Sequence, residues 1–168
     1  MSSEIVTSPF AADVSAFCRA CARFATGIAI VSVIDGEGAP RGMTVNSFTS
    51  VSLDPLLFLV CIDHRASIRA FLSIGTAIAI NVLSEEQQPL SERFARPGQD
   101  RFGELDWEPG VTGAPLIPGN LATIEGVIRD KMIAGDHTIV LTEVRAACYR
   151  EGRPLVYFTS RYQRLGEP

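Results

Sequence analysis

A chain of 168 residues, 46% of them hydrophobic and 20% charged, has the length and composition of one folded domain with its own core. A formal net charge of −4 and a pI near 5.2 exclude the basic surface of a general nucleic-acid-binding protein. The sequence has no run of about eighteen apolar residues and no signal-peptide pattern, which predicts a cytoplasmic protein without membrane contact.

The chain opens with a predicted amphipathic helix over residues 8–24, because apolar side chains recur there at helical spacing. Ser8 followed by Pro9 is a start signal, and Gly27 follows the end of the pattern. The apolar positions on this helix are Phe10, Val14, Phe17, Cys21 and Phe24.

Strand patterns separated by short turns make up most of the remaining chain. They predict strands at 27–34, 42–53, 56–62, 76–83, 121–133, 137–149 and 154–158. The run 56–62 is apolar throughout, so we expect it to be a central strand. Since the turns are too short for crossover helices, the fold is expected to be mainly β. We predict an antiparallel barrel with peripheral helices, not a doubly wound parallel sheet.

Two short helices are expected on the outside of this barrel, at 65–73 and 84–95. Ser84 and Gln87 stand at capping-box spacing at the start of the second helix. Pro89 follows closely and is expected to shorten or kink that helix.

The domain organisation is expected to be simple. A loop rich in Gly and Pro runs from residue 96 to about 120, and a polar tail follows the last strand. No internal repeat or linker occurs, so we predict one domain over 1–168 with its barrel at about 27–160.

The stretch GMTVNSFTSVSL, residues 42–53, interrupts its own strand pattern. The period of two set by Met43 and Val45 slips twice before Leu53, and short polar residues fill the gap. The residues expected to anchor the two ends in the core are Met43, Val45, Val51 and Leu53. One interpretation is a solvent-facing edge strand. The other is an opened strand whose backbone and short polar side chains meet a flat heteroaromatic ligand.

The remaining motifs give no nucleophile and no metal site. The four cysteines are expected to be free thiols, with the C-x-x-C pair Cys18 and Cys21 in core or semi-buried positions. GEGAPRG departs from a dinucleotide fingerprint because Arg41 replaces the third glycine. His64 and His137 are too few for a His-rich metal site, and His137 follows a predicted turn.

Seven segments in order resemble the short-chain flavin reductases, the reductase components of two-component flavin-dependent monooxygenases. The resemblance runs from about Phe17 to Leu165. It is carried by FATGIAIVSV, GMTVNSFTSVSLDP, LVCIDHRAS, ERFA…DRF, APLIPGNLATIEG, AGDHTIVLTEV and PLVYFTSRYQRL. It implies an FMN-binding split barrel of Greek-key type, usually a homodimer, that binds FMN or FAD without covalent attachment.

The resemblance also implies which residues form the site. The residues expected to line the isoalloxazine and its ribityl chain are Thr44, Val45, Asn46, Ser47, Phe48, Thr49 and Ser50. Those expected on the phosphate side are the segment from Asp63 to Ser67, together with Arg101 and Phe102. His137 matches the family histidine placed beside the nicotinamide, so it is the expected catalytic residue.

The implied activity is NAD(P)H:flavin oxidoreduction. NADH or NADPH reduces an exchangeable flavin, and the backbone N–H groups of residues 46–50 are expected to stabilise the charge that develops on it. Reduced flavin would then pass to a separate monooxygenase. Two alternatives stay open: a flavin carrier or sensor without turnover, and an amine-oxidising relative of the pyridoxamine-phosphate oxidases.

Four positions depart from the common pattern of the family. Ala25 and Leu56 stand where proline is common, Gly126 where cysteine is common, and Thr142 where glycine is common. We expect these departures to reflect packing or turns and not the chemistry.

Overall fold

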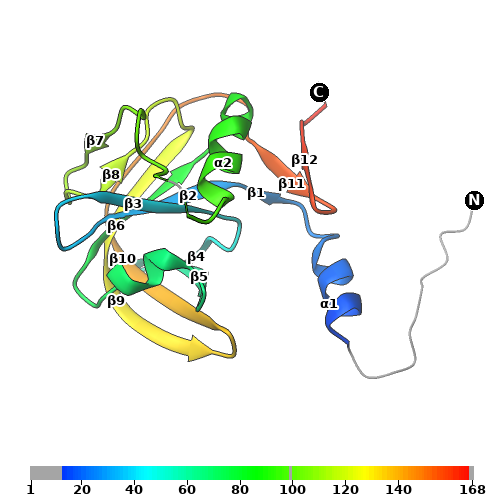
Figure 1. The fold of residues 1–168 in the computed structure, drawn as a ribbon, viewed down its shortest axis with the longest axis horizontal. Coiled ribbons are helices and arrows are strands. Elements are labelled where there is room, and N and C mark those ends of the chain that lie inside the picture. Colours follow the sequence, from blue (N-terminus) through cyan, green and yellow to red (C-terminus); the bar gives the residue numbers. More distant parts are fainter. Residues whose placement is uncertain (1–12, 99, 167–168) are drawn as a thin grey trace, which may run out of the picture.

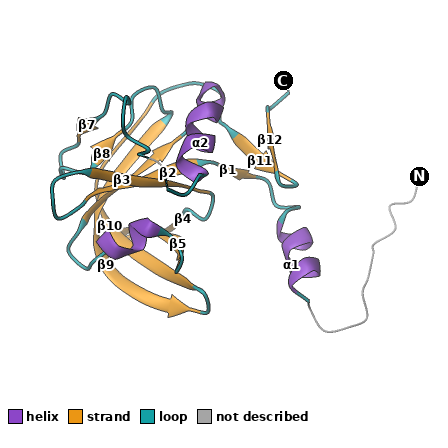
Figure 2. Ribbon diagram, viewed as in Figure 1, coloured by secondary structure: helices purple, strands orange, loops and turns teal. Residues whose placement is uncertain are grey.

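The computed structural model describes residues 13–98 and 100–166, in which strands predominate (Figure 1, Figure 2). The helical segments are α1 (Val14–Cys21), η1 (Ser67–Phe71), η2 (Glu85–Gln87) and α2 (Gln88–Ala95). The strands are β1 (Thr26–Gly27), β2 (Ala29–Ile34), β3 (Pro40–Val45), β4 (Thr49–Leu53), β5 (Leu56–Asp63), β6 (Ala77–Val82), β7 (Glu108–Pro109), β8 (Pro115–Leu116), β9 (Ala122–Ala134), β10 (His137–Tyr149), β11 (Val156–Phe158) and β12 (Arg161–Gln163).

The largest sheet has seven antiparallel strands in the order β3-β2-β6-β9-β10-β5-β4. Its two edge strands, β3 and β4, are joined by only residues 46–48, which we call the seam. The chain can stretch about 14 Å from Val45 to Thr49, whereas a flat seven-stranded sheet would hold its edges about 29 Å apart. The sheet therefore has to curl. This arrangement confirms the predicted mainly β, antiparallel barrel with peripheral helices.

The core consists of two apolar clusters, one on each face of β2. Val31 and Val33 pack in the barrel interior with buried residues of β3, β5, β6, β9 and β10. Ile30 faces the other way, into a cluster that holds Phe94 of α2 and Phe102 of the following loop. Because both faces of β2 are covered, its residues are apolar with little alternation, apart from the buried Ser32.

Helix α1 is shorter and more exposed than the sequence predicts. It spans Val14–Cys21, with Asp13 as its N-cap, and residues 8–12 of the predicted helix lie outside the described residues. None of its residues is buried, and Figure 1 shows it standing beside the barrel, next to β11 and β12. The expectation that Cys18 and Cys21 are core or semi-buried thiols is therefore wrong, since both are exposed.

Residues 42–53 form two strands where the sequence pattern indicates one interrupted strand. Met43 and Val45 contact the core as expected, but Val51 is 48% exposed and Leu53 is 87% exposed. The expectation that these two residues anchor the segment is wrong because β4 is an edge strand, with a register shift between Ser50 and Ser52. Edge strands have only one neighbour to cover their side chains.

Two further strand assignments change. β5 is buried on one face only and lies between β10 and the edge strand β4, so it is not central. The polar tail contains an additional strand, β12, which pairs with β11 and, with β1, makes a separate three-stranded sheet. This small sheet carries Tyr157 and Tyr162 toward α2, where they reach the site described below.

The second helix begins as the sequence predicts. The Ser84 N–H donates to Gln87 Oε1 at 3.1 Å, which is one half of a capping box. Pro89 then lies in the first turn of α2, where a missing N–H costs nothing, so it starts the helix and does not kink it.

Two departures from the family pattern, Gly126 and Thr142, lie against each other on β9 and β10. A Cβ atom at position 126 would lie 2.6 Å from Thr142 Cγ2, and closer still to the carbonyl oxygen of Glu143. No side chain fits at 126 beside a threonine at 142. The departure at 126 is therefore explained by packing, since the nearest atom belongs to the backbone of Glu143, while nothing in the structure explains Thr142, whose hydroxyl is buried without a hydrogen-bond partner among the described residues.

Candidate functional site

A pocket of about 560 Å3, the main pocket, lies under α2 at the open edge of the barrel. It is bounded by β3, the end of β5, the loop after α2 and the two strands β11 and β12. The lining residues are Ile28, Met43, Thr44, Val45, Asn46, Asp63, Arg65, Ala66, Ser67, Phe94, Ala95, Pro97, Gly98, Arg101, Tyr157 and Tyr162. Six residues predicted to bind a cofactor are among them, namely Thr44, Val45, Asn46, Asp63, Ser67 and Arg101.

The seam is held beside this pocket by the hydroxyl group of Ser47. It accepts a hydrogen bond from the Cys61 N–H at 3.1 Å and donates one to the Cys61 carbonyl oxygen at 3.0 Å. The pairing of β4 with β5 begins at Thr49 and Leu59, so the hydroxyl extends it by two residues after the strand has ended. The Ser47 hydroxyl proton is therefore already used, and its backbone is the part that stays available to a ligand.

One wall of the main pocket is held together by hydrogen bonds that connect Thr44, Ser91 and Tyr162. Thr44 Oγ1 donates to the carbonyl oxygen of Ser91 on α2 at 2.6 Å, and Ser91 Oγ lies 2.9 Å from Tyr162 Oη. The Tyr162 ring packs edge-on against Tyr157, with ring centroids 5.4 Å apart. These contacts fix two aromatic rings and the β3 backbone around one end of the pocket.

Asp63 and Arg65 form an ion pair at the opposite end of the pocket. The Asp63 carboxylate accepts hydrogen bonds from the Arg65 backbone N–H at 2.7 Å and from Arg65 Nη2 at 2.7 Å. The hydrogen bonds from Arg65 hold the pKa of Asp63 well below its usual value, so the carboxylate stays charged at neutral pH. Because Asp63 is itself an anion, Arg65 is the member of this ion pair that can meet a bound anion.

Arg101 and Ser67 complete this polar end. Arg101 donates from Nη1 to the Gly42 carbonyl oxygen at 2.6 Å and from Nη2 to the Arg96 carbonyl oxygen at 2.8 Å. Burial lowers the pKa of Arg101, but an arginine keeps its charge in a protein, and the remaining N–H groups are available to a ligand. Ser67 is the exposed first residue of η1 and lines the same end.

The other residues predicted to line the isoalloxazine, Ser47 to Ser50, line a second pocket. It also measures about 560 Å3 and lies on the far side of Val45 and Asn46. Thr49 and Ser50 are exposed there on β4, while Phe48 packs on Phe58 with ring centroids 5.6 Å apart. The residues shared by the main and second pockets are Ile28, Val45 and Asn46. The seam is thus a ridge between two hollows.

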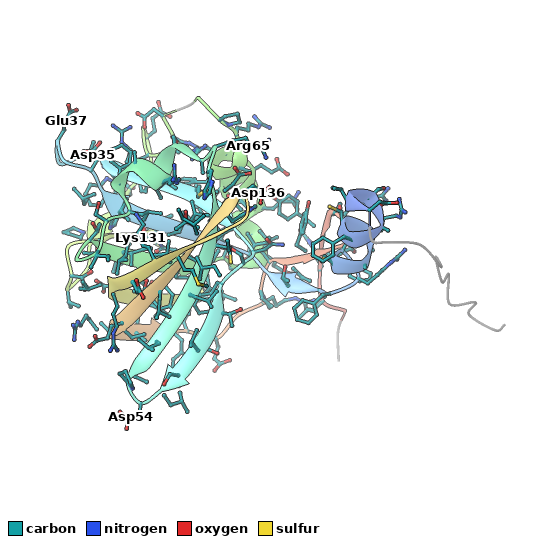
Figure 3. All side chains as sticks on the ribbon, turned by 90° about the horizontal axis from the view of Figure 1, so that it is seen from below. Asp35, Glu37, Asp54, Arg65, Lys131 and Asp136 are labelled. Atoms are coloured by element: carbon teal, nitrogen blue, oxygen red, sulfur yellow. The ribbon has the colours of Figure 1, made fainter. Side chains whose placement is uncertain are left out.

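His137 lies at the rim of the main pocket and does not line it. It is the first residue of β10, its backbone is paired with Asp63 of β5, and its side chain is 42% exposed. Its Nδ1 lies 2.7 Å from the Asp136 carboxylate, and this contact lowers the pKa of Asp136. Figure 3 shows Asp136 close to Arg65, so the histidine stands beside the charged end of the pocket.

Phe102 differs from its predicted place. It is 4% exposed and packs edge-on against Phe94 at 5.0 Å, so it supports the wall of the main pocket from behind. Arg65 lies within the segment 63–67 that the resemblance implies for the phosphate side, whereas sequence reasoning missed Tyr157 and Tyr162. For the two tyrosines, the signal in the sequence is their place in the segment VYFTSRY, which resembles the family. Their approach to β3 depends on the fold, so no local pattern shows it.

Two negative findings apply to residues 13–98 and 100–166. No group of three or more His, Cys, Asp or Glu side chains there could hold a metal ion. No helix in the same ranges is long and apolar enough to cross a membrane.

Comparison with known families places this site in context. The profile of the family described as "Flavin reductase like domain" matches residues 21–166. The chain belongs to the flavin reductase family. This membership agrees with the resemblance noted in the sequence and with the barrel.

Similar proteins of this family carry related names. The chain is 43% identical over 165 residues to the "FMN reductase (NADH) SmoA" of Agrobacterium fabrum, covering 98% of this chain and 94% of that protein. It is 40% identical over 134 residues to a stachydrine N-demethylase reductase subunit of Rhizobium meliloti, of which it spans 58%. A solved structure of the NADH:FAD oxidoreductase SgcE6 of Streptomyces globisporus, with NAD and FAD fragments, has a TM-score of 0.85 and 36% identity, covering 92% and 93% of the two chains.

The main pocket of this flavin reductase family member has the features that a flavin requires. One end offers the Tyr157 and Tyr162 rings beside the apolar side chain of Ile28. The other end offers arginine N–H groups, which suit a phosphate. A flat aromatic ring system joined to a phosphate matches this division, and the volume lies within the range of ligand pockets, about 300–1,000 Å3.

Replacing Ser47 by alanine is expected to loosen the seam. The change leaves the Cys61 N–H and carbonyl oxygen without their partner, so we expect the free energy of unfolding to fall by about 1–3 kcal/mol. Urea denaturation measures it. Ser52→Ala is the matched control, because the exposed Ser52 hydroxyl accepts only the Asp54 N–H at 3.2 Å. Equal losses for the two variants would contradict the role of Ser47.

Proposed function

We propose that this protein is an NAD(P)H:flavin oxidoreductase that reduces FMN or FAD and releases reduced flavin to a separate monooxygenase. The observation that carries the proposal is the divided main pocket, aromatic at one end and cationic at the other, beside an open seam in a barrel of the flavin reductase family. The names of related proteins support it, since they are NADH- or NADPH-dependent flavin reductases.

The proposed flavin position follows from the chemistry of the two ends. The isoalloxazine ring lies against Val45, Asn46 and the seam, near the Tyr157 and Tyr162 rings. The phosphate lies toward Ser67, Arg65 and Arg101, where N–H groups remain unused. Since noncovalent contacts hold it in an open pocket, the flavin is exchangeable, as a supplier of diffusible reduced flavin requires.

The backbone of the seam is proposed to contribute to catalysis. Within the described part of the chain, the N–H groups of residues 46–48 have no backbone hydrogen-bond partner. When bound, the flavin supplies the acceptor for a hydride from NADH or NADPH. The Asn46, Ser47 and Phe48 N–H groups are proposed to stabilise negative charge at the edge of the ring, whereas Thr49 and Ser50 are paired with β5 and line the second pocket.

His137 is proposed to orient the nicotinamide. Asp136 accepts a hydrogen bond from Nδ1–H, so Nε2 is left as an acceptor at the rim of the pocket. An acceptor at this place suits the carboxamide N–H groups of a nicotinamide that stacks on the flavin from the solvent side. The residue then positions the co-substrate and transfers no proton.

The protein is proposed to act in the cytoplasm as one domain over 1–168 and as a homodimer. The apolar face of α1 supports the dimer, because Phe17 is 64% exposed and Phe24, just after the helix, is 77% exposed. A second copy that covers this face would bury it. The monooxygenase partner is a separate protein, in line with relatives named as reductase components of monooxygenases.

The reductase activity is tested by mixing the purified protein with NADH or NADPH and excess FMN or FAD. We expect many turnovers per protein molecule, measured as a fall in the absorbance of the reduced nicotinamide. A protein that binds flavin and oxidises neither NADH nor NADPH would be a carrier or sensor instead. Oxidation of an amine in place of NAD(P)H would identify the amine-oxidase alternative.

Replacing His137 by alanine is expected to raise the KM for NADH about tenfold, through loss of one hydrogen bond of roughly 1.4 kcal/mol. The Kd for flavin, measured by fluorescence titration, should change less than twofold. His137→Gln keeps an acceptor near the same place and should recover part of the loss. Unchanged KM in both variants would refute the positioning role.

The dimer is tested by light scattering after size-exclusion chromatography. The wild-type protein should have the mass of two chains, and Phe17→Asp should shift it toward one chain, because a carboxylate cannot be buried unpaired in an apolar interface. Tyr149→Asp is the matched control, since Tyr149 is 84% exposed on β10. A monomeric wild-type protein would refute the proposal.

A further inference from the structure

A second basic site adjoins the main pocket along the segment after β5. We call it the cationic pocket. It measures about 460 Å3, and its charged or titratable lining residues are His64, Arg65, Arg69 and Lys131. No carboxylate is among its described lining residues. It shares residues 65–67 with the main pocket, so the two hollows meet where the flavin phosphate is proposed to lie.

His64 is one of the lining residues, and its ring carries an unpaired nitrogen. Its ring atom Nε2 is buried and has no hydrogen-bond partner among the described residues. Its backbone N–H donates to the Asp136 carbonyl oxygen at 2.9 Å, which ties the segment to the turn between β9 and β10.

Lys131 and Arg69 supply charge that is still available. Lys131 is the only lysine of the chain, and its Nζ donates to the Leu72 carbonyl oxygen at the end of η1, which leaves two N–H groups. Arg69, on the exposed side of η1, has no ion-pair partner within the described residues.

We infer that the cationic pocket binds the phosphate groups of the adenosine half of a dinucleotide, either FAD or the nicotinamide co-substrate. The inference rests on the proposed function and extends it beyond the mononucleotide. Clustered arginine and lysine N–H groups favour phosphate, whose oxygens accept several charge-assisted hydrogen bonds. A mononucleotide such as FMN ends at the Ser67 end of the main pocket. A dinucleotide extends past that point. Its adenosine-side phosphate would enter the cationic pocket, which shares residues 65–67 with the main pocket.

The test compares Lys131→Met with the wild-type protein by calorimetric titration of FMN, of FAD, and of NAD+ and NADP+ in the presence of FMN. We expect the Kd of at least one dinucleotide to rise about tenfold, the effect of losing a hydrogen bond from a charged group. The Kd for FMN should change less than twofold. Lys131→Arg keeps the charge and should restore most of the affinity. Arg69→Met should repeat the selective loss.

The outcomes separate the two sources of phosphate. A rise for FAD alone assigns the pocket to the flavin, and a rise for NAD+ or NADP+ alone assigns it to the co-substrate. Either one supports the inference. Unchanged dinucleotide affinity, or an equal loss for FMN, would overturn it. Arg145→Met on β10 is the control for a general effect of charge, since Arg145 pairs with Glu143 outside both pockets. None of these titrations requires turnover, so they stay readable if the reductase assay fails.

Discussion

Three residues connect the two edges of a seven-stranded sheet, and this short connection determines the shape of the molecule. Since residues 46–48 cannot span the width of a flat sheet, the sheet curls until β3 and β4 face each other. The closure is made by the chain and not by a complete ladder of hydrogen bonds. An opening therefore remains, and the main and second pockets lie on its two sides. The Ser47 hydroxyl, bonded twice to Cys61, keeps that opening at a fixed place.

The polar and charged residues of the site lie at the ends of strands and helices or in the loops beside them. Asp63 closes β5, Arg65 follows it, Ser67 starts η1, and Arg101 lies in the loop after α2. Each of these positions frees the side chain from the burial that a strand interior imposes. Carbonyl oxygens of Gly42 and Arg96 fix Arg101, and Arg65 is fixed by Asp63. An acidic protein can in this way present a local cationic surface without becoming a binder of nucleic acids.

Much of this arrangement could be predicted from the sequence, for local reasons. Alternating apolar residues predicted the barrel strands, and the slip in alternation after Val45 predicted the place where the strand opens. Other features depend on contacts between distant segments. Tyr162 looks like part of a polar tail until β12 pairs with β11, and no local pattern shows that Ser91 meets it. The exposure of α1 could not be predicted either, because an amphipathic pattern does not show what covers the apolar face of a helix.

The seam has a consequence for the behaviour of the whole chain in concentrated solution. β3 and β4 each pair with a single neighbour in the sheet, so both have one row of backbone groups outside any ladder. Curling brings the two rows toward each other at the seam. A cut in residues 46–48 would release both at once and turn a closed barrel into a sheet with two open templates for strand addition. The tightness of this one loop is thus also a safeguard against fibril-like assembly.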